Sequence, residues 1–575
     1  MTKRLSLSGL LALLCGFNVV WSQSAYNNHA QLSGRLKALT TQYASLASVQ
    51  SIGKSTQGRD LWVLAVGKNT NTKKPAVLIV GGLEGVHLAG SEMVLQMAEK
   101  MLAAANTDSV AKLLETKTFY FLPNGNPDAQ EQFSAKLKYE RSGNGTETDD
   151  DRDGRNGEDP FEDLNNDGII STIRVEDPTG TFVVSKEDPR ILLKADPNKG
   201  ETGKYLVMTE GIDNDKDGAF NEDGPGGVHI DKNFTFEYPV FNVGAGDYAA
   251  SESETRAVLD FLYKTNHIFA VLTFGPNNNL SEAPKFDPTK ALKKIPNGPS
   301  AKDAAVGEQV SKIYNSRTGL KDAPALPQSK GNFAQTAYYH AGRLSFTTPG
   351  WWVPKTEAPK DTTKKAATPA TVAPAGGAMP RAGMMGAMGA AAPANNAGED
   401  ELRLLKWADK EKLSVYSDWK TIQHPDFVGK KVEVGGFMPF AKLNPPVSYL
   451  NEAATKHLKF ITELGQQMPE IELVNLKTES LGNGLSRVSV QVLNKGLLPT
   501  YAEIGDRVRW VSRVKTELKL SAGQSFVSGK RLYLRNALGA GEQEEYTWLV
   551  MGAGKVILEA GCPTAGIKTA EVVLK

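Results

Sequence analysis

Three acidic loops, each with a glycine at the same place, hold the densest group of side chains that could do chemistry. Their patterns are Asp149-x-Asp151-x-Asp153-Gly154, Asp163-x-Asn165-x-Asp167-Gly168 and Asp213-x-Asp215-x-Asp217-Gly218. Oxygen ligands at positions 1, 3 and 5 with glycine at position 6 can wrap a hard cation, because the glycine permits a sharp turn and the carboxylates converge. We therefore expect structural calcium at these loops.

The loops differ from EF-hands at one diagnostic position. The twelfth residue, where an EF-hand has a bidentate glutamate, is Pro160, Arg174 or Gly224. Short calcium loops of the thrombospondin kind are closer in pattern. The alternative is that all three are solvated acidic turns, and the repetition of one pattern favours calcium.

The segment from Tyr26 to about Phe274 predicts an α/β layered domain, because apolar strands alternate with amphipathic helices. Strands are expected at 75–80, 118–122 and 268–274. The loops that follow such strands are where sites form in open α/β sheets. A helix after Gly81-Gly82 carries Met93, Met97 and Met101 at helical spacing, which predicts a buried face.

The chain from about Ile471 onward predicts a small all-β sandwich of about a hundred residues. Val488, Val490 and Val492 alternate with polar residues, and further strands are expected at 546–550, 556–560 and 569–574. Between these two regions, residues 355–400 consist mainly of Ala, Pro, Gly, Met and Thr, which indicates a low-complexity insertion within the first domain.

The N-terminus has the order of a secretory signal peptide. Lys3 and Arg4 precede an apolar run from Leu5 to about Trp21, followed by small and polar residues. We expect residues 1–23 to be removed and the mature chain to have no transmembrane span, the alternative being an uncleaved anchor. A secreted, periplasmic or cell-surface location follows, and Cys562 is then the one cysteine left, so no internal disulfide can form.

Charge and composition exclude some classes of function. Lys and Arg total 66 against 65 Asp and Glu, and 40% of the residues are hydrophobic. No global field would draw the chain to nucleic acid, so we expect no nucleic-acid partner. A peptide or protein ligand remains open, and the sequence says nothing of the oligomeric state.

Several ordered motifs resemble those of the zinc carboxypeptidases. Gly81-Gly-Leu-Glu84-Gly-Val-His87 is similar to the family's first metal motif, and Asn124-Gly-Asn-Pro-Asp128 to its Asn-Pro-Asp-Gly turn. Val228-His-Ile-Asp-Lys-Asn-Phe234 and Ser251-Glu-Ser-Glu-Thr255 resemble two further segments. The resemblance spans about residues 26–464 and implies an α/β carboxypeptidase-like mixed sheet flanked by helices. The strand pattern predicts that a small immunoglobulin-like sandwich follows it at 470–575.

The resemblance implies a zinc site held by three protein ligands, with a glutamate to move protons. Glu84 stands where the family has histidine and His87 where it has glutamate, an inverted pair whose residue types both bind zinc. The third ligand position is Gly275, and the catalytic glutamate position is Pro349. Neither residue offers a side chain for these roles, so we name no catalytic residue.

The family's clamp for the substrate carboxylate is also altered. Its Asn-Arg pair corresponds to Asp231 and Lys232, and an added carboxylate would repel an anionic terminus, while lysine lacks the bidentate fork of arginine. Tyr338 and Tyr339 are expected to line the cleft and contact a ligand.

Three functions follow from these expectations. The first is a catalytically degenerate, exported carboxypeptidase-like protein that binds a peptide or another ligand in the former cleft. The second is an active zinc hydrolase in which His229 or His340 replaces the lost ligand. The third is a calcium-stabilised surface adhesion protein that acts through its sandwich.

Overall fold

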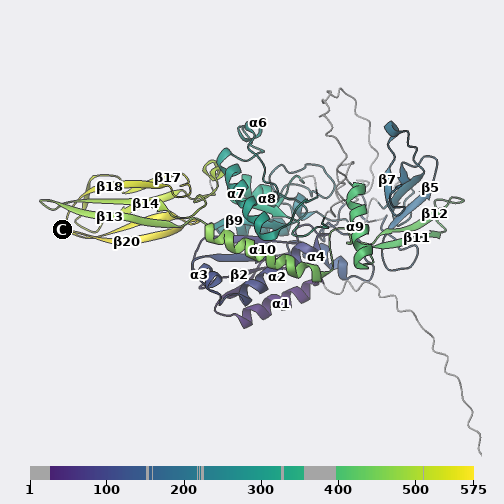
Figure 1. Ribbon diagram of the computed structural model, residues 1–575, viewed down its shortest axis with the longest axis horizontal. Helices are drawn as coiled ribbons and strands as arrows, with labels where there is room; N and C mark the ends of the chain where they lie inside the picture. Colours follow the sequence, from purple (N-terminus) through teal and green to yellow (C-terminus); the bar gives the residue numbers. More distant parts are fainter. Residues whose placement is uncertain are drawn as a thin grey trace, which may run out of the picture.

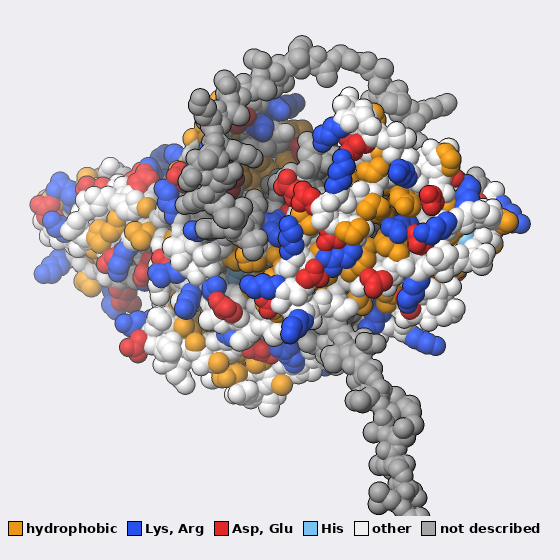
Figure 2. Space-filling view, turned by 45° about the vertical axis from the view of Figure 1, so that its right-hand side comes forward, with side chains coloured by type: hydrophobic (Ala, Val, Ile, Leu, Met, Phe, Trp, Pro, Cys, Tyr) orange, Lys and Arg blue, Asp and Glu red, His pale blue; other side chains and the backbone are white. Residues whose placement is uncertain are grey.

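The computed structural model describes residues 26–149, 154–157, 159–216, 218, 220–221, 226–324, 329–354, 397–508 and 510–575. The expected signal peptide and most of the low-complexity insertion lie outside these residues. Within the described part, no helix is both long and apolar enough to cross a membrane. Acidic and basic side chains are interspersed over the face shown in Figure 2, which agrees with the balanced composition.

A six-stranded mixed sheet forms the centre of the molecule. Its strand order is β1-β2-β4-β3-β9-β10. The strands are β1 (Ala47–Lys54), β2 (Asp60–Val66), β4 (Thr118–Leu122), β3 (Ala76–Val80), β9 (Ile268–Phe274) and β10 (Leu344–Thr348). The last four run parallel, and β1 and β2 pair antiparallel at one edge. The three expected strands are all present.

Helices cover both faces of this sheet (Figure 1). One face packs α1 (His29–Gln42), α2 (Leu88–Ala103), α3 (Asp108–Thr116), α7 (Ala301–Thr318) and α10 (Val447–Gln467); the other packs α5 (Ser253–Lys264) and α8 (Phe333–Tyr339). Val77 and Ile79 of β3 face the first core and Leu78 the second, which is why this strand reads as a continuous apolar run. Short turns α4 (Pro127–Gln130), α6 (Pro288–Ala291), η1 (Glu131–Ser134), η2 (Pro197–Lys199) and η3 (Ile230–Lys232) lie in the connections.

A second six-stranded sheet, which the sequence pattern did not predict, lies at the end of the molecule away from the sandwich (Figure 1). Its order is β11 (Tyr416–Ile422), β12 (Val432–Phe437), β5 (Thr172–Glu176), β8 (Tyr205–Thr209), β6 (Phe182–Val184) and β7 (Leu192–Lys194), beside α9 (Ala397–Glu411). Ile173, Val175, Val432 and Val434 form its small core. The strands of this sheet are short, and the pairing of β12 with β5 joins segments more than two hundred residues apart, so the local pattern gives almost no signal.

The C-terminal region consists of two four-stranded antiparallel sheets, as expected. One contains β13 (Ile471–Gly482), β14 (Leu485–Asn494), β18 (Gln543–Met551) and β16 (Ser525–Ser528). The other contains β17 (Leu532–Arg535), β15 (Val514–Lys519), β19 (Gly554–Cys562) and β20 (Gly566–Leu574), and η4 (Glu503–Arg507) precedes them. Trp548 is fully buried between the sheets, and alternate residues of β14 and β18 line the same core.

Candidate active-site cleft

Three loops that follow neighbouring parallel strands bring the expected site together. Glu84 and His87 follow β3, Gly275 follows β9, and Pro349 follows β10. β9 pairs with both neighbours, and the Gly275 N–H donates to the Thr348 carbonyl at 3.1 Å. The carboxyl ends of these strands therefore meet at one sheet edge, which is the usual place for a site in this kind of sheet.

His87 is packed inside the protein at the start of α2. Only 2% of its surface is exposed. Burial lowers the pKa of the imidazole to about 4, although the carbonyls of Phe274 and Pro349 act in the opposite direction. Nδ1 has no hydrogen-bond partner of ordinary geometry in the described part of the chain. His87 is therefore a neutral ring wedged between α2 and the ends of β9 and β10.

Gly90 is what allows this position of the ring. A Cβ atom at Gly90 would lie 2.7 Å from His87 Nδ1 and 2.8 Å from the Phe274 carbonyl oxygen. Real Cβ contacts are not this short, so any side chain would displace the imidazole or the strand end.

Glu84 shares the cleft with a second carboxyl group and a cation. Burial raises the pKa of Glu84, and Lys232 counteracts this rise. The pKa of Asp231 rises to about 8, first through burial and then through the nearby Glu84 charge. The Phe333 N–H donates to Asp231 Oδ1 at 2.9 Å. The structure thus brings Glu84, Asp231 and Lys232 into one electrostatic group.

Gly275 leaves open space where the resemblance implies a third ligand. A Cβ atom at this position would have no neighbour within 4 Å. No side chain of the described residues fills this position, so the third ligand is missing here because of the residue type.

The two histidines considered as replacement ligands have other environments. His229 packs against Gly244, where a Cβ atom would lie 2.8 Å from Nε2, and burial lowers the pKa of the ring to about 3. His340 Nδ1 lies 2.8 Å from the Thr235 hydroxyl, and burial lowers the pKa of that ring as well. No group of three His, Cys, Asp or Glu side chains among the described residues could hold a metal ion. The residues present do not fit the three-ligand zinc site of the resemblance.

The two tyrosines expected in the cleft are held by protein contacts. The Tyr338 hydroxyl donates to Asp303 Oδ2 at 2.8 Å, and the Tyr339 ring stacks on Phe236 with centroids 4.1 Å apart. Burial is the main cause that raises the pKa of both phenols. Their role in ligand binding remains a prediction.

Other motif residues tie the loops of the cleft together. Asp128 accepts hydrogen bonds from the Ser55 hydroxyl at 2.6 Å and from Arg59 Nη1 at 2.7 Å. Asn144 Nδ2 donates to Glu252 at 2.9 Å and to Glu254 at 3.2 Å. These polar contacts hold the loops of the cleft to one another, which gives these motif side chains a structural role.

Arg141 is a residue of this region that sequence reasoning missed. A Cβ atom at Gly85 would lie 2.6 Å from the Arg141 carbonyl oxygen, so this segment lies directly against the Glu84 loop. Its Nη2 donates to the Asn144 carbonyl, and its Nε is buried without a partner among the described residues. No motif spacing links Arg141 to Glu84, so only the fold could identify it.

The acidic loops adopt one repeated turn. The glycine N–H donates to Oδ2 of the first aspartate in each loop: Gly154 to Asp149 at 2.9 Å, Gly168 to Asp163 at 2.8 Å and Gly218 to Asp213 at 3.1 Å. The φ angles of these glycines are 95°, 83° and 96°, a region that favours glycine. Asp151, Asp153 and Asp217 lie outside the described residues.

The loops also contact one another through their acidic side chains. Asp159 accepts from the Asn214 N–H at 2.9 Å, which joins the first loop to the third. Glu210 accepts from the N–H groups of Leu164 and Ser171, both at 2.9 Å, across the second loop, which contains Asn165 and Asp167. Asp215, another of the expected calcium ligands, lies in the third loop. Calcium binding at these loops remains a prediction.

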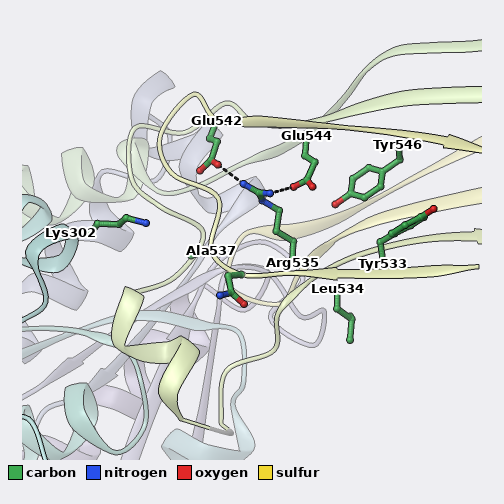
Figure 3. Close-up of a pocket in the computed structure, with 9 residues that line it drawn as sticks. Lys302, Tyr533, Leu534, Arg535, Ala537, Glu542, Glu544 and Tyr546 are labelled. Atoms are coloured by element: carbon green, nitrogen blue, oxygen red, sulfur yellow. Dashed lines mark hydrogen bonds and ion pairs between the residues drawn. The ribbon is translucent and has the colours of Figure 1, made fainter. Parts of the chain in front are cut away.

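A separate hollow lies where the sandwich meets α7 (Figure 3). It has a volume of about 450 Å³, and Arg535 reaches across it to Glu542 and Glu544. Lys302 lines the opposite side, and Tyr533 and Tyr546 lie beyond the ion pairs. None of these residues belongs to the cleft around Glu84.

The sequence matches two protein-family models. Residues 34–348, more than half of the 575, match the model described as Zinc carboxypeptidase. Residues 470–573 match the one described as Domain of unknown function (DUF8731). The chain therefore belongs to the zinc carboxypeptidase family, and its mixed sheet with helices on both faces is the fold that the motifs predicted.

Relatives with known names include carboxypeptidase D of Drosophila melanogaster, 34% identical over 121 residues, and carboxypeptidase M of Mus musculus, 29% identical over 167 residues. These alignments cover 20% and 28% of this chain but only 9% and 37% of the relatives. Among solved structures, carboxypeptidase A from Helicoverpa armigera has a TM-score of 0.35 and 14% identity, covering 57% of this chain and 64% of that chain.

Proposed function

We propose that this chain is an exported, catalytically degenerate zinc carboxypeptidase-family protein that binds a peptide or related ligand in the former active-site cleft. The observation that carries the proposal is the pair of residues at the ends of β9 and β10. Gly275 has no side chain to ligate a metal, and Pro349 has no group that can accept or release a proton.

The remaining cleft supports binding better than hydrolysis. The Cβ position of Gly275 has no described neighbour within 4 Å, which leaves room for atoms of a ligand beside the strand ends. Glu84, Asp231 and Lys232 offer charged and hydrogen-bonding groups there. Because the raised pKa leaves the Asp231 carboxyl largely protonated at pH 7, this position disfavours a free C-terminal carboxylate once Asp231 ionises above about pH 8.

Zinc analysis of the purified mature protein tests the loss of catalysis. We expect less than one zinc per chain and no release of C-terminal residues from peptides. Stoichiometric zinc that is lost together with hydrolysis in both Glu84→Ala and His87→Ala would contradict the proposal and favour the rearranged hydrolase.

Binding is tested with a tripeptide and its C-terminal amide as probes in calorimetry. We expect the amide to bind more tightly than the free acid at about pH 9, where Asp231 is ionised, and Asp231→Asn to reduce this preference. Lys264→Ala is the matched control, since Lys264 pairs with Asp260 on the surface of α5. Equal or absent binding of both probes would count against the cleft as a peptide site.

A further inference from the structure

Arg343 is a buried cation without a counter-charge at the junction of the central sheet and the sandwich. It directly precedes β10 and is 1% exposed. Its Nη2 donates to the Trp510 carbonyl at 3.3 Å. Nε and Nη1 are buried and have no hydrogen-bond partner, and Arg343 forms no ion pair with any carboxylate in the part of the chain that the structure describes. Two nitrogen donors of Arg343 and its positive charge therefore have no partner among the described residues.

The groups that face Arg343 do not supply the missing charge. They are the Tyr263 phenol, the Cys562 thiol and the His267 ring. Burial raises the pKa of Cys562 and of Tyr263, so both are neutral at pH 7. The pKa of Arg343 falls to about 10 through burial, so the guanidinium itself keeps its charge at that pH.

His267 is a second side chain of this region with a buried nitrogen that lacks a partner among the described residues. Its Nε2 lies 2.9 Å from the Tyr120 hydroxyl, and its Nδ1 is buried without a partner among the described residues. Lys73 and Arg343 both lower the pKa of this ring, after burial. The titratable groups of the described residues that act on Arg343 and His267 are therefore cationic or neutral.

A buried, unpaired guanidinium is strongly unfavourable, and buried polar groups in proteins almost always have partners. A neutral water molecule would satisfy an N–H group but not the charge. We propose that Arg343 binds a small inorganic anion, of which chloride is the form to test, at the junction between the sheet and the sandwich. The ion must be small, because only 1% of the Arg343 surface is exposed.

The anion would also stabilise the attachment of the sandwich. Trp510, whose backbone carbonyl accepts from Arg343, packs its ring at a tilt against Tyr263 with ring centroids 4.5 Å apart. Gly342 packs so closely that a Cβ atom would lie 2.6 Å from Val508 and 2.7 Å from Val511. Loss of the anion therefore loosens residues of both regions together.

Thermal unfolding in chloride and in gluconate, at equal ionic strength, tests the site on the full mature chain. Because a ligand that binds only the folded state raises its stability, the wild type should melt at a higher temperature in chloride. Arg343→Met should abolish this difference, while Arg487→Met, which removes a surface partner of Glu479, should keep it. Equal melting temperatures for the wild type in both salts would overturn the proposal, as would an unchanged chloride effect in Arg343→Met.

A second measurement does not depend on a folded variant. Crystals of the wild type grown with bromide in place of chloride should show an anomalous peak within hydrogen-bonding distance of Arg343 Nε and Nη1. A map with no anomalous peak at this position would sink the proposal, even if the variant fails to fold.

Discussion

The carboxylate of Asp303 accepts the backbone N–H of Ile504 at 3.0 Å, and this contact joins the central domain to the sandwich. Its other oxygen accepts the Glu503 N–H at 2.7 Å. Asp303 lies in the first turn of α7, while Glu503 and Ile504 begin η4. A carboxylate at the start of a helical turn satisfies N–H groups that have no partner within the turn. The same carboxylate accepts the Tyr338 hydroxyl, so one side chain connects the sandwich to α8.

Asp303→Ala should destabilise the protein through this junction. The substitution leaves the buried Ile504 N–H, the partly buried Glu503 N–H and the partly buried Tyr338 hydroxyl without their acceptor, at a cost of about 1–3 kcal/mol. Denaturant unfolding measures the loss. Asp260→Ala, on the exposed surface of α5, is the control and should change stability by less than about 0.5 kcal/mol. Equal effects of the two substitutions would show that Asp303 does not stabilise the junction.

Acidification should destabilise the fold through His457. This ring is fully buried, with Nδ1 2.8 Å from the Ala453 carbonyl, and burial lowers its pKa from 6.5 to about 4. The unfolded chain therefore binds a proton that the folded chain does not between these pH values, and stability falls as the pH drops from about 6.5 to about 4. The full shift corresponds to about 3 kcal/mol.

Unfolding curves of the wild type and His457→Gln, measured at several pH values, check this linkage. We expect a shallower loss of stability in the variant over the same interval. Parallel pH profiles would mean that other groups account for the acid sensitivity, with His87 and His229 as the next buried rings to test because their pKa values are lowered in the same direction.

Two glycines at the cleft should respond in opposite ways to alanine. Gly275→Ala should change stability by no more than about 0.5 kcal/mol, because its Cβ enters open space. Gly90→Ala should cost about 1–3 kcal/mol, because its Cβ collides with His87 and the Phe274 carbonyl. Urea unfolding compares the two variants directly. A destabilised Gly275→Ala would contradict an open cleft at that position.

Calcium should raise the thermal stability of the mature protein if the acidic loops bind it. We expect a chelator to lower the melting temperature and added calcium to restore it, since the ion offsets repulsion among clustered carboxylates. Asp163→Asn should reduce this response, whereas Asp260→Asn on an exposed helix should not. Identical melting curves with calcium and with chelator would favour solvated turns.

Much of the fold follows from local sequence pattern. The strands at 118–122 and 268–274 were predicted with the bounds that β4 and β9 have, because fully buried parallel strands consist of apolar runs between turn residues. Met93, Met97 and Met101 lie in the core at the helical spacing that predicted it. The sandwich was predicted by alternation in β14, where every second side chain is buried.

Only part of the candidate site could be predicted from the sequence pattern. The motifs placed Glu84, His87 and Gly275 at strand ends, because chain order and strand direction determine which loops share an edge. The motifs could not show that His87 is buried beside the carbonyl groups of Phe274 and Pro349. Nor could they show that Arg141 lies against the Glu84 loop, since both contacts depend on packing between distant segments.

The sequence by itself determined the family, the layered sheet, the sandwich and the residue types at the former metal site. Each of these follows from a local sequence pattern or from motifs in a fixed order. Only the tertiary structure decided which polar groups have partners. A Cβ atom at Gly275 would enter open space, whereas one at Gly90 would collide with its neighbours. Asp303 accepts hydrogen bonds from two N–H groups, whereas Arg343 has no counter-charge among the described residues. These differences arise because burial and pairing are set by contacts between segments that are far apart in the chain.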